Sequence, residues 1–101
     1  MYSLYLIRNV GCDDETIGLA RMTAEQLASF KYIIDNLNKN STYQCMPKIA
    51  VYKINEDMLI KPNEGHMKED IMYLDDQEYV LKDRWFMYDH NEETEEVERI
   101  I

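Results

Sequence analysis

Residues 23–37, TAEQLASFKYIIDNL, carry the clearest structural signal in the chain. The first four fit a capping box, in which Thr23 and Gln26 each accept a hydrogen bond from the other's backbone N–H. Apolar side chains then recur at helical spacing and form one stripe: Leu27, Phe30, Ile33, Ile34 and Leu37. The pattern predicts an amphipathic helix from residue 24 to about residue 37 that buries the whole stripe and ends in the polar residues 38–42.

Strand signals lie on both sides of this helix. Residues 2–8 favour pleated structure, and residues 17–22 are predicted as the returning strand of a hairpin after the turn signal at residues 11–15. Residues 48–54, 71–74 and 79–88 are predicted strands, with residues 75–78 as a four-residue hairpin connection. The order β-β-α-β-β-β predicts the α+β class, with an antiparallel sheet of about five strands and one amphipathic helix packed on a face.

The end of the chain, from about residue 89, is an acidic tail. Its glutamates suit the first turns of a short helix, because negative charge interacts favourably with the helix dipole there: Glu92, Glu93, Glu95 and Glu96. Val97, Ile100 and Ile101 have the spacing that would dock such a helix, but a helix this short is marginal alone and a frayed tail fits equally well. We predict a single domain over residues 1–101.

Length and composition exclude several classes of protein. The 101 residues are 46% hydrophobic and 31% charged, with three Gly and two Pro, which excludes collagen-like, low-complexity and wholly disordered chains. No stretch approaches the ~20 apolar residues of a membrane span, and the N-terminus lacks the pattern of a signal peptide. We therefore expect a cytoplasmic protein without membrane contacts. Cys12 and Cys45 are usually reduced in that compartment, although a disulfide between them stays open.

Charge is unevenly distributed along the chain, whose net charge is −9. Residues 1–55 hold five acids and six bases, whereas residues 56–101 hold fifteen acids and five bases, so the second half carries a net charge of −10. Such a chain repels nucleic-acid phosphates, and we expect no direct binding of DNA or RNA. A strongly acidic surface can instead attract a basic protein, although solubility alone also explains it.

Residue patterns that carry catalysis or metal binding are weak in this chain. Cys12, Cys45, His66 and His90 could in principle ligate zinc, but none of them has the paired spacing of zinc ligands. The isolated glycines form no phosphate loop, and the serines form no nucleophile elbow. We therefore expect no enzyme activity, no metal and no cofactor.

Two stretches offer contact anchors for a partner. Tyr43 and Met46 lie in a polar loop after the predicted helix, where they either bind a partner or cover the helix end. Residues 84–88, RWFMY, place large apolar groups on both faces of the predicted strand. We expect one of these faces to pack in the core. The other face, which is either that of Trp85 or the opposite one, must be covered by the tail, by a second copy in a homodimer, or by a partner protein.

The stretches VGCDD, residues 10–14, and LNKNSTYQCMP, residues 37–47, look like those of uncharacterised small proteins of low-GC Gram-positive bacteria and their phages. This resemblance covers about the first half of the chain and implies a bacterial host but no activity. In size and acidity the chain also resembles phage-encoded inhibitors of host defence such as anti-CRISPR proteins, several of which imitate DNA with surface carboxylates.

Our leading hypothesis is a small acidic binding protein of a phage or mobile element, which inhibits a basic, nucleic-acid-handling host protein. Its carboxylates would occupy Lys and Arg sites that normally hold phosphates. The predicted contact residues are Asp75, Asp76, Glu78, Glu92, Glu93, Glu95 and Glu96, with Tyr43 and Trp85 as anchors. Two alternatives stay open: a binder of a nucleotide signal that uses Tyr43, Arg84 and Trp85, and a self-associating structural protein.

Overall fold

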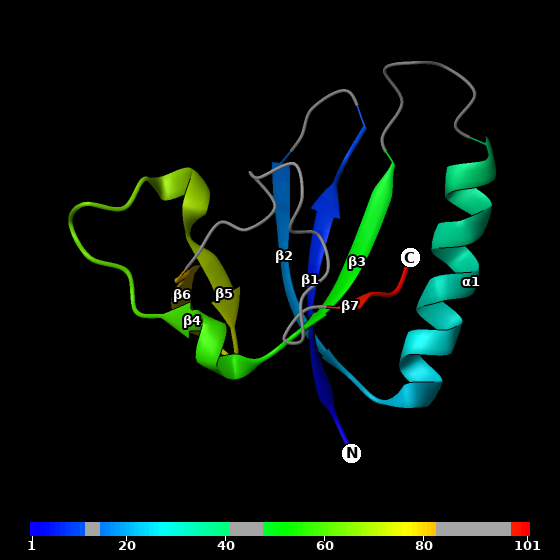
Figure 1. Ribbon diagram of the computed structural model, residues 1–101, viewed down its shortest axis with the longest axis horizontal. Coiled ribbons are helices and arrows are strands. Elements are labelled where there is room, and N and C mark those ends of the chain that lie inside the picture. Colours follow the sequence, from blue (N-terminus) through cyan, green and yellow to red (C-terminus); the bar gives the residue numbers. More distant parts are fainter. Residues whose placement is uncertain (12–14, 41–47, 83–97) are drawn as a thin grey trace.

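The structure is a computed structural model that describes residues 1–11, 15–40, 48–82 and 98–101 (Figure 1). The first part of the chain forms a hairpin, a helix and a strand: β1 (Ser3–Asn9), β2 (Glu15–Met22), α1 (Ala24–Asn40) and β3 (Ile49–Ile54). The second part forms short elements: η1 (Glu56–Met58), β4 (Leu59–Ile60), η2 (Lys68–Asp70), β5 (Met72–Leu74), β6 (Gln77–Leu81) and β7 (Glu98–Arg99). The α+β class predicted from the sequence is confirmed.

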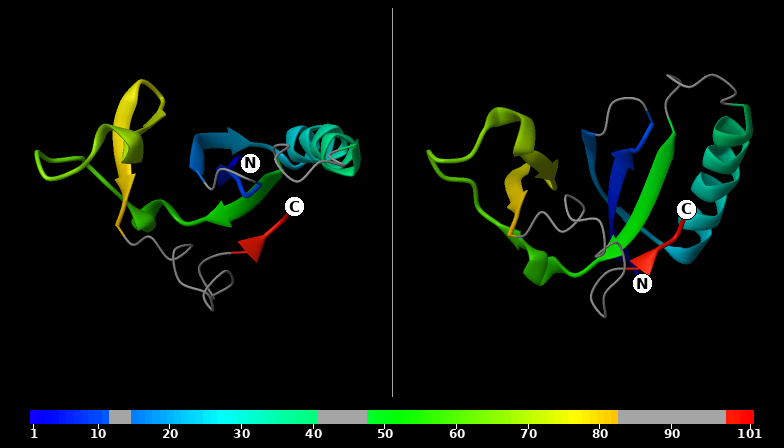
Figure 2. Two further views of the ribbon diagram at one scale, coloured as in Figure 1. Left: turned by 90° about the horizontal axis from the view of Figure 1, so that it is seen from above. Right: turned by 45° about the horizontal axis from the view of Figure 1, so that its top comes forward.

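The strands are divided between two antiparallel sheets. The larger sheet has the order β2-β1-β3-β7, and the smaller one has the order β4-β6-β5. Because β2 and β3 flank β1 and both run antiparallel to it, α1 is the crossover that returns the chain to the far side of β1. In Figures 1 and 2 the helix lies on one side of the larger sheet and the smaller sheet on the other.

The main core lies between the two sheets. Leu4 and Leu6 of β1 share one face with Ala50, Tyr52 and Ile54 of β3, as the register of the two strands requires. Met58, Met72 and Leu74 from the smaller sheet and its flanking turn complete this buried cluster. Leu6 and Ala50 are fully buried in this layer, so the whole apolar surface of both side chains contributes to stability.

The opposite face of the larger sheet also holds buried side chains. Tyr5 and Val51 point to this face by strand alternation and are 4% and 0% exposed. Ile34 is the buried residue of the helix, at 5% exposure. The capping box predicted at the start of α1 is confirmed, because Gln26 N–H donates to Thr23 Oγ1 at 3.2 Å and Thr23 N–H donates to Gln26 Oε1 at 2.9 Å.

The C-terminal end of α1 is attached to the first residue of β3. The Asn38 side-chain amide donates to the Ile49 carbonyl oxygen, and its oxygen accepts from the Ile49 N–H, both at 3.0 Å. The amide thus occupies both backbone groups of Ile49 on this edge of β3. The helix runs to Asn40 instead of ending near Leu37 as predicted. The two hydrogen bonds between Asn38 and Ile49 explain why Asn38 belongs to the helix.

The burial predicted for the helix stripe is only partly correct. Ile34 is buried and Leu27 and Phe30 are half-buried, but Ile33 is 55% exposed and Leu37 is 54% exposed. The apolar stripe of α1 is therefore wider than the contact with the sheet.

Among the described residues, no helix is long and apolar enough to cross a membrane.

Two further predictions are corrected at the hairpin and at the end of the chain. The connection between β5 and β6 has two residues, Asp75 and Asp76, instead of the predicted four, because β6 begins at Gln77. The strand predicted over residues 79–88 is described only as far as Leu81, and residues 83–88 lie outside the described residues. Glu98 and Arg99 form strand β7 against β3 where a short helix was one of the two expectations. The Ile100 N–H also donates to the Val51 carbonyl at 2.8 Å, which extends this pairing by one residue.

Candidate partner-binding surface

Residues 55–82 form a lobe of their own beside the larger sheet, and we call it the acidic lobe. It contains η1, β4, η2, β5 and β6, and it holds eight acids and three bases, for a net charge of −5. The rest of the described residues hold four acids and seven bases, for a net charge of +3. Within the described residues, the charge difference between the two halves of the sequence is therefore a difference between two parts of the fold.

Three of the predicted contact residues lie at one end of the acidic lobe. Asp75 and Asp76 make the tight turn between β5 and β6, Glu78 follows in β6, and all three are exposed. The other predicted contacts lie outside the described residues: Tyr43, Trp85, Glu92, Glu93, Glu95 and Glu96. The structure therefore brings together one of the two acidic groups that the sequence suggested.

The geometry of the β5–β6 turn by itself gives a reason for two aspartates at this place, with no partner needed. Asp75 and Asp76 have φ angles of 52° and 64°, the left-handed conformation that both central residues of a type I′ turn adopt. Asp is among the few residues besides Gly and Asn that accept this conformation readily. A two-residue turn of this type also suits the twist of the strands it joins, so the aspartates have a structural role here.

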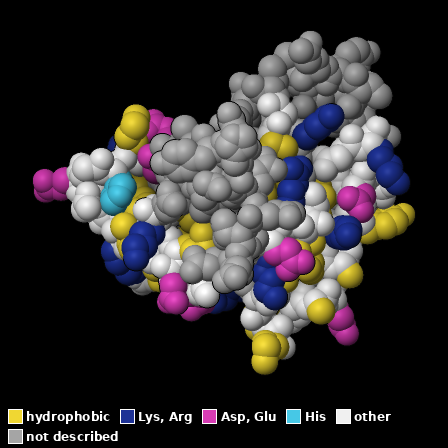
Figure 3. Space-filling model, in the orientation of Figure 1, with side chains coloured by type: hydrophobic (Ala, Val, Ile, Leu, Met, Phe, Trp, Pro, Cys, Tyr) yellow, Lys and Arg dark blue, Asp and Glu magenta, His cyan; other side chains and the backbone are white. Residues whose placement is uncertain are grey.

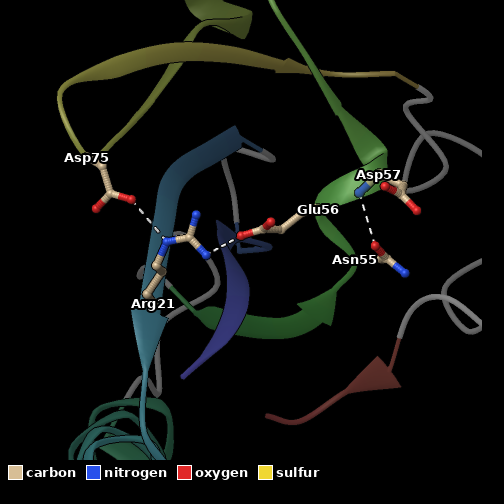
Figure 4. A network of polar contacts seen from close by, with 5 residues as sticks. All are labelled: Arg21, Asn55, Glu56, Asp57 and Asp75. Atoms are coloured by element: carbon tan, nitrogen blue, oxygen red, sulfur yellow. Dashed lines mark hydrogen bonds and ion pairs between the residues drawn. The ribbon is translucent and has the colours of Figure 1, made fainter. Parts of the chain in front are cut away.

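Arg21 links the acidic lobe to the larger sheet. It projects from the end of β2, and its Nε donates to Asp75 Oδ2 at 3.0 Å while its Nη1 donates to Glu56 Oε1 (Figure 4). These two carboxylates come from the β5–β6 turn and from η1. Asn55 caps η1 by accepting a hydrogen bond from the Asp57 N–H at 3.0 Å, which holds the short turn that carries Glu56. Arg21 is not among the residues that the sequence patterns singled out.

The two carboxylates change the acidity of the arginine. The hydrogen bond that Arg21 donates to Glu56, followed by the one it donates to Asp75, raises the pKa of Arg21 above its ordinary value. Because its pKa is raised, the guanidinium is charged at every pH below the ordinary value and loses its proton only as the pH rises through the raised one. Arg21 is thus charged across the whole working range of pH, and its own titration adds no pH dependence to stability there.

Replacing Arg21 by glutamine is expected to lower the urea midpoint of unfolding at low salt. The Arg21 side chain is 37% exposed, so the interaction is screened, and the difference from the wild type should shrink strongly in about 1 M NaCl. Lys31→Gln, an exposed change on α1 with the same loss of charge, is the control. A midpoint difference that is equal at both salt concentrations would show that Arg21 acts through packing instead of through its ion pairs.

Two surface hollows lined by described residues adjoin the lobe. The first, of about 150 Å³, is lined by Arg21, Glu56, Leu59, Leu74 and Tyr79. It is smaller than the roughly 300–1,000 Å³ of ordinary ligand pockets, and its cation is already held by two carboxylates. The second, of about 490 Å³, is wide open and is lined by Lys61, Pro62, Asp76, Gln77 and Glu78. Lys61 donates to Gln77 Oε1 at 3.0 Å and lies 4.3 Å from the Tyr79 ring centre.

The carboxylates of the lobe are spread over its surface. On the face seen in Figure 3, acidic side chains lie between Lys, Arg and apolar side chains and do not form one block. Seven of the eight acids of the lobe are exposed, and Asp70 is half-buried. In the part of the chain that the structure describes, no three His, Cys, Asp or Glu residues converge as a metal site would require.

Of the four residues considered as zinc ligands, His66 alone lies within the described residues. His66 closes the turn after Pro62, where its Nδ1 accepts from the Asn63 N–H at 3.0 Å, while Cys12, Cys45 and His90 lie outside the described residues. The described surface that stands out is therefore the acidic lobe. Comparisons with protein-family models, with curated proteins and with solved structures find no match, so the geometry above is what any assignment of function rests on.

Proposed function

We propose that this protein is a small acidic binding protein whose acidic lobe docks on a basic, nucleic-acid-handling protein of a bacterial host and inhibits it. The observation that carries the proposal is the separation of charge within the fold. A net charge of −5 on residues 55–82 stands against +3 on the other described residues. A molecule with such a separation approaches a basic partner in a preferred orientation, because the partner attracts one part and repels the other.

Competition with nucleic acid is the proposed mechanism of inhibition. Lys and Arg side chains that hold phosphates also bind carboxylates, often through two parallel hydrogen bonds from arginine. Asp76 and Glu78 are the described contacts we favour, because they are exposed at the end of the lobe and Asp75 is engaged with Arg21. The glutamates of the tail would extend this surface if they lie on the same side.

The test begins with immobilised protein and a nuclease-treated lysate of a low-GC Gram-positive host. We expect it to retain a DNA-binding protein, and duplex DNA added afterwards should release that protein. The triple variant Glu64→Gln, Asp76→Asn, Glu78→Gln should then associate with the identified partner about tenfold more slowly at low salt. The association rate of the wild type should fall steeply with rising salt, whereas the dissociation rate should change less.

A matched control removes three charges from the other part of the molecule. The variant Glu15→Gln, Asp35→Asn, Glu98→Gln has the same change in net charge outside the acidic lobe. It should slow association much less than the lobe variant does. An equal effect of both variants would reduce the mechanism to net charge, and a partner that duplex DNA does not displace would contradict competition for phosphate sites.

The nucleotide-binding alternative gains no support from the described residues. Its three proposed contacts, Tyr43, Arg84 and Trp85, all lie outside them. A nucleotide site needs a concave pocket with a free basic residue and a stacking aromatic ring. The small hollow beside Arg21 has a cation and a tyrosine in its lining, but Glu56 and Asp75 already occupy the guanidinium.

A further inference from the structure

The turn between β4 and η2 is closed by hydrogen bonds that run in both directions between its ends. The His66 N–H donates to the Asn63 carbonyl oxygen at 3.0 Å, and the Gly65 N–H donates to Asn63 Oδ1 at 2.8 Å. A Cβ on residue 65 would lie 3.1 Å from this oxygen, so the glycine makes room for the bond. In the opposite direction, the Asn63 N–H donates to His66 Nδ1 at 3.0 Å.

The start of α1 uses the same contact with a different acceptor. There the Thr23 N–H donates to Gln26 Oε1 at 2.9 Å, so a backbone N–H again bonds the side chain three positions later. A glutamine amide keeps its charge state at every ordinary pH, whereas an imidazole does not. The chain therefore holds one version of this contact that is insensitive to pH and one that is sensitive to it.

The imidazole of His66 can accept this hydrogen bond only while it is neutral. Nδ1 has a free lone pair in the neutral ring whose proton is on Nε2, and protonation places a hydrogen on Nδ1 as well. A protonated Nδ1 is a donor that faces the donor N–H of Asn63, so the bond is lost. Histidine side chains change charge between about pH 8 and pH 5, and the bond is therefore present at the alkaline end and lost at the acid end.

Charged groups of both signs lie on the turn and on the elements beside it. They are Lys61 after β4, Glu64 in the turn, Lys68, Glu69 and Asp70 in η2, and Asp76 and Glu78 at the hollow that Pro62 also lines. None of these described residues forms a hydrogen bond or an ion pair with His66, and Lys61 is held by Gln77 and the Tyr79 ring. The described side-chain contact that protonation breaks is thus the one with Asn63.

We propose that residues 63–66 form a pH-sensitive switch, which is closed while the His66 ring is neutral and opens when acid protonates it. Protonation also adds one positive charge, so the net charge of the acidic lobe changes from −5 to −4. Pro62 precedes the turn and lines the open hollow, so opening the turn changes one wall of that hollow. This inference is independent of the proposed partner, because the turn is observed in the isolated protein.

Nuclear magnetic resonance of the full chain tests the switch between about pH 8 and pH 5. At the alkaline end the ring nitrogens of His66 should show the tautomer with its proton on Nε2. On acidification the protection factor of the Asn63 amide against hydrogen exchange should fall about tenfold, which corresponds to about one hydrogen bond. The protection factor compares the amide with an unfolded peptide at the same pH, so it removes the ordinary effect of pH on exchange.

The Thr23 amide and two variants serve as controls. The protection of Thr23 should stay constant over the same range, because Gln26 does not titrate there. His66→Gln supplies the acceptor that Gln26 supplies in α1, so it should keep the Asn63 amide protected at both ends of the range. His66→Ala removes the acceptor and should leave that amide unprotected at both ends. The ring resonances of His66 are those missing from either variant.

Three outcomes would overturn the proposal. A His66 ring that carries its proton on Nδ1 at the alkaline end cannot accept from Asn63. A protection factor of the Asn63 amide that is equal at both ends in the wild type shows that protonation leaves the turn closed. An equal fall in the wild type and in His66→Gln assigns the pH dependence to another group.

Discussion

Replacing Leu6 by alanine is expected to lower the free energy of unfolding by about 3 kcal/mol or more, which is a large share of the roughly 5–15 kcal/mol that stabilises a typical domain. Leu6 is fully buried, and it lies at the centre of the larger sheet, between Leu19 of β2 and Tyr52 of β3. The truncation leaves a cavity that two rigid sheets cannot close. Urea denaturation followed by circular dichroism measures the loss.

Residues of α1 provide the matched comparison for Leu6. Ile33→Ala removes a similar amount of apolar surface from a side chain that is 55% exposed, and it should cost less than about 1 kcal/mol. Phe30→Ala should lie between the two, because Phe30 is half-buried. An Ile33→Ala loss as large as that of Leu6→Ala would contradict the placement of the helix.

Replacing Asn38 by alanine is expected to lower the free energy of unfolding by about 2 kcal/mol. The substitution removes two hydrogen bonds and leaves both the N–H and the carbonyl of Ile49 without the amide. Because Asn38 attaches the end of α1 to the start of β3, the loss should be concentrated there. Hydrogen exchange of the Ile49 amide measures it, and this amide should exchange much faster in the variant.

Asn38→Asp separates the hydrogen bonds from the general effect of a changed side chain. The carboxylate still accepts from the Ile49 N–H, but it cannot donate to the Ile49 carbonyl and repels it. We expect this variant to destabilise the fold at neutral pH and to recover part of the loss in acid, where a protonated carboxyl can donate again. Stability that is the same for Asn38→Asp and the wild type would show that the Ile49 carbonyl is satisfied in another way.

Local signals in the sequence predicted the local structure well. The capping box at Thr23 and Gln26 involves residues three positions apart, and its two hydrogen bonds are those that the pattern predicts. The strand predicted over residues 48–54 is also present, as β3 from Ile49 to Ile54. Such features depend on backbone geometry within one or two turns, which the sequence specifies without reference to the rest of the fold.

Features that depend on distant residues were the ones missed. Arg21 lies 54 positions from Asp75 and 35 positions from Glu56, and nothing near Arg21 in the sequence indicates either partner. Ile33 fits the apolar stripe as well as Ile34 does, but the contact with the sheet is too narrow to bury both. The two-residue turn at Asp75 was missed because Asp-Asp lacks the glycine that usually marks a type I′ turn.

The candidate site also combines local features that the sequence predicts with contacts that only the fold creates. The acidity of residues 55–82 is plain in the sequence, and so is the exposure of the aspartates in a turn. What the sequence could not show is that Asp75 is engaged by Arg21 while Asp76 points to no partner among the described residues. Two neighbouring carboxylates of equal chemistry therefore differ in their availability, and only the folded arrangement separates them.

Strand β7 has a consequence for the protein during its synthesis. The Arg99 that pairs with Tyr52 lies 47 positions after it. At the roughly 5–20 residues per second of a translating ribosome, β3 is made about 2–10 seconds before the strand that covers its outer edge. During this interval a nascent chain presents an uncovered strand edge, which is the feature that invites pairing with other chains. The crowded polysome is therefore the setting in which this fold is most exposed to misassembly.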